Sequence, residues 1–140
     1  MERSNIVVGD ADVLIAQLVE DDANYEKVFQ LEKKLQFLNV TPIFPITAIA
    51  EALTVLKIRK RNTLAVQTLV KVAKDGGMIV EEITTSLFQN ACTLFKSDDS
   101  KRNTFFDAIV VAVAKKHKAI AVFSFDSWYK KQGFKLAEEL

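Results

Sequence analysis

Short apolar strands alternate with helical segments along the chain, and this alternation limits the fold to the α/β class. Ile6–Val8 and Ala119–Phe123 are wholly apolar, which is typical of strands that helices cover on both faces. The pattern therefore predicts a mostly parallel central sheet of four to five strands between helices. Ligands of such sheets bind outside the carboxyl ends of the strands.

The expected elements follow from the periodicity of the apolar residues. We expect strands at Ile6–Val8, Thr41–Ile46, Met78–Ile83 and Ala119–Phe123, with Phe134–Leu136 as a last edge strand. We expect helices at Val13–Val19, Asn24–Leu38, Thr47–Ile58, Asn62–Lys74, Thr85–Phe95 and Thr104–His117, and a short helical turn at Trp128–Lys131. Thr47 is the predicted cap of its helix.

Size and composition are those of one soluble domain, residues 1–140. The formal net charge of +1 argues against a strongly basic nucleic-acid coat, although it leaves room for a local basic face. Cys92 is the single cysteine, so an intramolecular disulfide is excluded, which fits a cytoplasmic protein. We expect Cys92 in the core. The sequence contains neither an apolar run long enough for a membrane span nor a signal-peptide pattern.

Five acidic residues each stand in an apolar stretch, whereas most of the other acids lie among charged neighbours. They are Asp10, Asp12, Glu51, Asp107 and Asp126. An ionised carboxylate in an apolar setting is costly unless it is compensated. Because no basic residue is adjacent in sequence, these acids either pair with distant bases or share a cation.

The placement of four of the acids favours a shared cation. Asp10 and Asp126 follow the ends of predicted strands, and Glu51 and Asp107 lie in the first turns of helices that begin near the same edge of the sheet. Ligands that are all oxygen atoms suit Mg²⁺ or Mn²⁺. Such ions activate water and neutralise charge during phosphodiester hydrolysis.

Four of the five acids also have a specific structural interpretation, whereas Glu51 lies one residue too far from Thr47 for a capping box. Thr104-x-x-Asp107 is a capping-box pattern, and Asp126 is placed to cap the turn that follows it. Asp10 can end a strand in a turn, and Asp12 can cap the helix that begins at Val13. Capping and metal ligation can coexist at one carboxylate.

The four acids stand in motifs that resemble those of the PIN-domain family, VapC-type toxins in particular. The segment IVVGDADVLIAQL resembles the first motif and contains Asp10; ITAIAEALTVL resembles the second and contains Glu51; TFFDAIVVAVAKKHKAIAVFSFD covers the third and fourth, with Asp107 and Asp126. The order, spacing and length agree over nearly the whole chain. The resemblance implies a three-layer α/β/α PIN-like fold, a site for Mg²⁺ or Mn²⁺, and cleavage of RNA, single-stranded or structured, to leave a 5′-phosphate and a 3′-hydroxyl. It also implies a small antitoxin as partner and a homodimer.

Some positions depart from the family pattern. Ala11 stands where a hydroxyl residue is common, and Asp12 stands where Ser or Asn is common, so Asp12 is either an additional ligand or a cap. After Asp126, the residues Ser127, Trp128 and Tyr129 stand where another acid and a Phe are common, which leaves a fifth family acid in doubt.

Residues around the acids complete the predicted site. Thr104 and Ser124 are additional candidates. RNA needs a positive surface, and the basic candidates are Lys57, Arg59, Arg61, Lys101 and Arg102. Trp128 and Tyr129 are candidates for stacking on a base or for core packing.

Three other functions fit part of the pattern. A haloacid-dehalogenase-type phosphatase would use Asp10 as its nucleophile, but leaves Glu51 unexplained. A receiver-like signalling domain would place a Lys after the last core strand, where this chain has Ser124-Phe125-Asp126. A non-cleaving PIN-like module would bind RNA or protein only.

Overall fold

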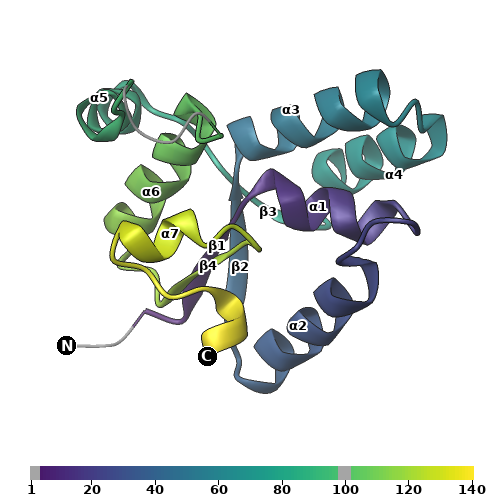
Figure 1. Ribbon diagram of the computed structural model, residues 1–140, viewed down its shortest axis with the longest axis horizontal. Coiled ribbons are helices and arrows are strands. Elements are labelled where there is room, and N and C mark those ends of the chain that lie inside the picture. Colours follow the sequence, from purple (N-terminus) through teal and green to yellow (C-terminus); the bar gives the residue numbers. More distant parts are fainter. Residues whose placement is uncertain (1–3, 98–101) are drawn as a thin grey trace.

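A four-stranded parallel sheet forms the centre of the computed structural model, which describes residues 4–97 and 102–140 (Figure 1). The strands are β1 (Ile6–Gly9), β2 (Thr41–Pro45), β3 (Ile79–Glu81) and β4 (Ala121–Phe123), in the spatial order β3-β2-β1-β4. Every strand pair is parallel. The predicted α/β class and parallel sheet are confirmed.

Helices cover both faces of the sheet, as the wholly apolar strands required. The helices are α1 (Ala11–Leu18), α2 (Tyr25–Phe37), α3 (Ile46–Thr54), α4 (Thr63–Lys74), α5 (Thr85–Leu94), α6 (Phe105–His117) and α7 (Trp128–Lys131), with a π-helical segment η1 (Val55–Arg59) and a 3₁₀ turn η2 (Ala137–Glu139). Figure 1 shows α1 to α4 on one side of the sheet and α5 to α7 on the other. No helix within the described ranges is long and apolar enough to cross a membrane.

Two hydrophobic cores flank the sheet because successive strand residues point to opposite faces. Val7 and Phe123 pack with α1, α2 and α4 in one core. Val8 and Val122 pack with α5, α6 and α7 in the other. Val7 and Val8 are both completely buried. The two cores fix the end of β1, and therefore the position of Asp10, from both sides.

The last residue of β1 is a glycine, Gly9, because the ring of Phe44 lies where a Cβ atom would be. A Cβ atom built on Gly9 would lie 2.1 Å from Cε1 of Phe44, far inside van der Waals contact. The next residue, Asp10, donates its backbone N–H to the carbonyl of Phe123 at 3.1 Å. This bond joins the carboxyl ends of β1 and β4.

Two predictions about single residues in helices were wrong: the cap at Thr47 and the burial of Cys92. The position before α3 belongs to Pro45, whose extended backbone lets the helix start directly after β2, so Thr47 lies inside the helix and does not cap it. Its buried Oγ1 atom has no hydrogen-bond partner among the described residues. Cys92 is exposed and not a core residue, because α5 turns Leu87 and Ala91 inward and the position after Ala91 faces solvent.

The expected edge strand at Phe134–Leu136 reduces to one parallel bridge, between Val122 and Leu136. The backbone N–H of Val122 donates to the carbonyl of Lys135 at 2.9 Å. The chain then turns into η2, so the ladder does not extend. The bridge still places α7, which precedes it, beside β4.

Candidate active site

Five carboxylates converge at the carboxyl ends of β1 and β4. Asp10 follows β1, Asp12 lies in the first turn of α1, Glu51 in α3, Asp107 in the first turn of α6, and Asp126 shortly after β4. Electrostatic coupling links them: Asp10 interacts with Asp12 and Asp107, Glu51 with Asp107 and Asp12, and Asp12 with Asp126. The structure therefore brings together the four acids predicted as a site and Asp12, the predicted additional ligand or cap.

Asp10 is the N-cap of α1 and is almost completely buried. Its Oδ1 atom accepts the N–H of Ala11 at 2.7 Å, and its Oδ2 atom accepts the hydroxyl of Tyr129 at 2.6 Å. Burial, followed by the charges of Asp12 and Asp107, raises the pKa of Asp10 well above its usual value. The carboxylate is thus held in a position where its ionised form is disfavoured.

Asp107 lies in the first turn of α6 and is also buried. Its Oδ2 atom accepts the backbone N–H of Thr104 at 2.9 Å, which confirms the predicted role of Asp107 in a capping box. The same oxygen accepts Nδ2 of Asn103 at 3.2 Å, and Oδ1 accepts the hydroxyl of Tyr129 at 3.2 Å. Thr104 contacts the cluster through its backbone, and the residue itself is exposed.

Asp126 is joined to Asp107 by one amide group. Nδ2 of Asn103 donates to Oδ2 of Asp126 at 3.2 Å as well as to Asp107. Oδ1 of Asp126 accepts the N–H of Trp128 at 2.9 Å, so the predicted capping of the following turn is confirmed. Asn103 therefore fixes the separation of two carboxylates that come from different elements.

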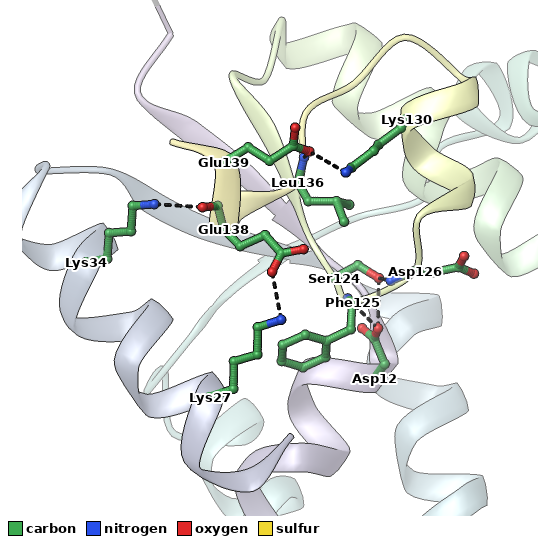
Figure 2. Close-up of polar contacts among 10 residues, drawn as sticks. All are labelled: Asp12, Lys27, Lys34, Ser124, Phe125, Asp126, Lys130, Leu136, Glu138 and Glu139. Carbon is green, nitrogen blue, oxygen red and sulfur yellow. Dashed lines mark hydrogen bonds and ion pairs between the residues drawn. The ribbon is translucent and has the colours of Figure 1, made fainter. Parts of the chain in front are cut away.

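Asp12 ties α1 to the loop after β4, as Figure 2 shows. Its Oδ2 atom accepts the hydroxyl of Ser124 and the N–H of Phe125, each at 2.8 Å. The Ser124 Oγ atom in turn accepts the N–H of Asp126 at 3.0 Å. Burial raises the pKa of Asp12 to about 6, against the lowering effect of these hydrogen bonds. Since Asp10 caps α1, the interpretation of Asp12 as the simple cap of that helix was wrong.

The other carboxylate oxygen of Asp12 has no hydrogen bond within the described part of the chain. The Oδ1 atom is buried and has no hydrogen-bond partner among the residues that the structure describes. A buried carboxylate oxygen without a donor is costly. A positively charged ligand would compensate this oxygen.

Glu51 lies in the second turn of α3 and not in the first as predicted, because the N-cap is Pro45, two residues before Thr47. The side chain is half buried beside a groove of about 410 Å³ that Ile58, Arg59 and Phe106 also line. Burial, then the charges of Asp107 and Asp12, raise the pKa of Glu51 to about 7, and the charge of Arg59 acts in the opposite direction.

Two residues of the cluster were not identified from the sequence as partners of the acids. Tyr129 is completely buried and its hydroxyl contacts two acids, which excludes a role of its ring in stacking on RNA. Trp128 packs edge-on against the Tyr129 ring at 5.3 Å. The sequence also did not predict that Asn103 contacts the acids. The available signal was its position, four residues before Asp107 and directly before the helix cap Thr104.

The basic candidates are only partly tested by the structure. Lys57 and Arg59 belong to η1 and Arg61 follows it, and all three are exposed, as is Arg102. Of the five, Arg59 acts on an acid of the cluster through its charge on Glu51. Lys101 lies outside the described residues.

The donor set of the site suits a hard divalent cation, but the acids are not arranged around one. All candidate ligands are carboxylate oxygens, as Mg²⁺ and Mn²⁺ prefer, and the orphaned Oδ1 of Asp12 supports that fit. Within residues 4–97 and 102–140, however, no three Asp, Glu, His or Cys side chains are grouped closely enough to hold a metal ion. Asp10 and Asp107 instead share the hydroxyl of Tyr129.

Comparisons with known proteins agree with the fold. The chain superimposes on the crystal structure of VapC20 from Mycobacterium tuberculosis, a sarcin–ricin loop cleaving toxin, with a TM-score of 0.77 and 19% sequence identity. The match covers 91% of this chain and 95% of that one. No curated protein matches by sequence. The PIN domain family matches residues 7–135, which include all five acids. The resemblance stated from the motifs is thereby confirmed: the chain belongs to the PIN domain family.

Proposed function

We propose that this protein is an endoribonuclease that depends on Mg²⁺ or Mn²⁺ and that serves as the toxin of a toxin–antitoxin pair. The observation that carries the proposal is the set of carboxylates at the carboxyl ends of β1 and β4, whose burial, followed by their mutual repulsion, raises the pKa values of Asp10, Asp12 and Glu51. A cation would relieve that repulsion.

Membership of the PIN domain family supports nuclease activity. The fold shared with VapC20, a toxin that cleaves the sarcin–ricin loop, supports RNA as the substrate and a toxin role. It also favours a PIN nuclease over a haloacid-dehalogenase-type phosphatase. On this proposal the partners are an RNA, single-stranded or structured, a small antitoxin and a second copy of the chain, and the protein acts in the cytoplasm.

Asp10, Glu51, Asp107 and Asp126 are the proposed ligands, and the free Oδ1 of Asp12 makes it an additional one. The bound ion would supply an activated water and neutralise charge on the phosphodiester. The chain itself holds these ligands in position. Asp10 and Asp107 are oriented by the backbone N–H groups that they accept at the starts of α1 and α6.

Loop contacts hold the remaining ligands. Ser124 links Asp12 to the backbone of Asp126, and Asn103 links Asp126 to Asp107. The basic residues would bind the phosphates that flank the cleaved bond; they are Lys57, Arg59, Arg61, Lys101 and Arg102. The groove beside Glu51 gives a bound strand room next to the acids.

The test is cleavage of labelled single-stranded and hairpin RNA in Mn²⁺, Mg²⁺ or EDTA. We compare the protein with a Glu51→Gln variant and a Glu82→Gln control, because Glu82 is an exposed glutamate outside the cluster. Cleavage that needs a metal, that persists in the control and that is lost in Glu51→Gln supports the proposal. Cleavage that persists in EDTA, or that survives Glu51→Gln, refutes it.

A non-cleaving PIN-like binding module is the second candidate. It is favoured by the hydroxyl of Tyr129, which stands between Asp10 and Asp107. RNA that is bound but uncut in both metals, over a panel of substrates, would support this alternative.

A further inference from the structure

The hydroxyl of Tyr129 lies between two carboxylates at the centre of the site. It is 2.6 Å from Oδ2 of Asp10 and 3.2 Å from Oδ1 of Asp107. A phenol carries one proton, so it can donate fully to only one of them, and the shorter distance assigns that proton to Asp10.

We propose that the Tyr129 hydroxyl occupies the position that a divalent cation bridging Asp10 and Asp107 would take, and that it weakens cation binding at this site. The inference rests on the proposed metal-dependent function and identifies a residue that sets the metal affinity. Tyr129 is a positioning residue, because it would act on the metal through the two acids that its hydroxyl contacts, Asp10 and Asp107.

The other oxygens of the two acids are already engaged. Oδ1 of Asp10 accepts the N–H of Ala11, and Oδ2 of Asp107 accepts the N–H of Thr104 and the amide of Asn103. The two oxygens that face each other are therefore the ones that the hydroxyl holds. A small cation sits about 2.0–2.1 Å from its oxygen ligands, so each of these two oxygens would have to exchange its hydrogen bond to the phenol for a bond to the cation.

Packing holds the Tyr129 side chain in this position. Tyr129 is completely buried in the core that contains Val122 and Leu136, and its ring packs edge-on against Trp128. Its carbonyl accepts the N–H groups of Gln132 and Phe134 at 3.1 and 3.2 Å. Metal entry therefore requires either a shift of α7 or an arrangement of acids that avoids the bridge.

Tyr129→Phe tests the inference because it removes one oxygen atom and leaves the ring in its core position. With the hydroxyl gone, one oxygen of each acid becomes available to a cation. We expect Mn²⁺ to bind about tenfold more tightly, which corresponds to ~1.4 kcal/mol. We also expect a lower melting temperature than the unchanged protein in EDTA, since the two facing carboxylates lose their shared donor, and a larger rise on adding Mn²⁺.

The measurement is Mn²⁺ titration by isothermal calorimetry on the intact protein, Tyr129→Phe and Tyr25→Phe. Tyr25 is the matched control, because it is the other tyrosine of the chain and contacts Phe29 in α2, away from the acids. Thermal unfolding of all three checks that they are folded.

The outcomes separate this inference from the proposed function. Tighter binding in Tyr129→Phe alone supports the inference, and so does binding that only this variant shows. Equal affinity in the unchanged protein and the variant overturns the inference and leaves the metal-dependent function standing. Weaker binding in the variant also overturns it, since the hydroxyl would then be helping to orient the ligands. Absence of binding in all three overturns both proposals.

Discussion

Replacing Glu51 by Gln should stabilise the metal-free protein at neutral pH while removing its activity. Burial and the charges of Asp107 and Asp12 raise the pKa of Glu51 from 4.5 to about 7. Taken in full, that rise would correspond to ~3 kcal/mol. Because the side chain is only half buried and solvent screens its interactions, we expect about 1 kcal/mol, or roughly 3 °C in melting temperature for a domain of this size.

The sign of the pH dependence follows from proton binding. Between pH 4.5 and about 7 the folded protein keeps a proton on Glu51 that the unfolded chain has lost, so the free energy of unfolding falls as pH rises through this window. The penalty is complete above pH 7 and absent below pH 4.5. A glutamine carries no such penalty, so the advantage of the variant should be full at pH 8 and close to zero at pH 4.5.

The assay is thermal unfolding in EDTA, followed by circular dichroism at pH 4.5, 6 and 8. Glu82→Gln again serves as the control, because the residue is exposed, and we expect it to melt with the unchanged protein at each pH. A Glu51→Gln variant that is no more stable than the unchanged protein at pH 8, or whose advantage is the same at pH 4.5, would refute the electrostatic reasoning.

Three further predictions concern the elements around the cluster. Gly9→Ala should cost about 1–3 kcal/mol in urea unfolding, because the new Cβ would meet the ring of Phe44; an unchanged midpoint would show that the ring moves aside freely. Ser124→Ala should cost about 1 kcal/mol, since it removes the hydroxyl that donates to Asp12, and a loss confined to activity with unchanged stability would contradict this. Lys57→Gln, made in an inactive background, should reduce the salt dependence of RNA binding by about one counterion; an unchanged slope in filter binding would place Lys57 outside the RNA contact.

The fold was largely predictable because its strands are short, apolar and regularly separated by helices. Such strands must be covered on both faces, which requires a parallel sheet between two layers. What the sequence did not specify was where each helix begins. Pro45 ends β2 with extended backbone, so α3 starts one residue before the hydroxyl of Thr47 can cap it. This start depends on the backbone of the preceding strand and not on the capping preference of one residue.

The acids of the site were predictable for a related reason. A carboxylate in an apolar stretch is conspicuous because it needs compensation, and all five acids found in this way meet in the structure. The donors that hold them were not conspicuous. Tyr129 and Asn103 occur in segments where an aromatic or an amide needs no special explanation. The bond from Tyr129 to Asp10 also joins residues 119 positions apart, which no local pattern encodes.

Hydrogen bonds hold the carboxylates of the cluster in fixed positions, but they do not balance the negative charge. Backbone caps, Asn103 and Ser124 fix the carboxylates, while burial and mutual repulsion raise the pKa values of Asp10, Asp12 and Glu51. Hydrogen bonds alone therefore leave the site electrostatically unfavourable at neutral pH. A ligand that binds only the folded state would recover this free energy as binding affinity. The same residues that lower the stability of the metal-free protein are then the ones that would hold a cation, so stability in EDTA and affinity for Mn²⁺ should change in opposite directions when Glu51 is neutralised.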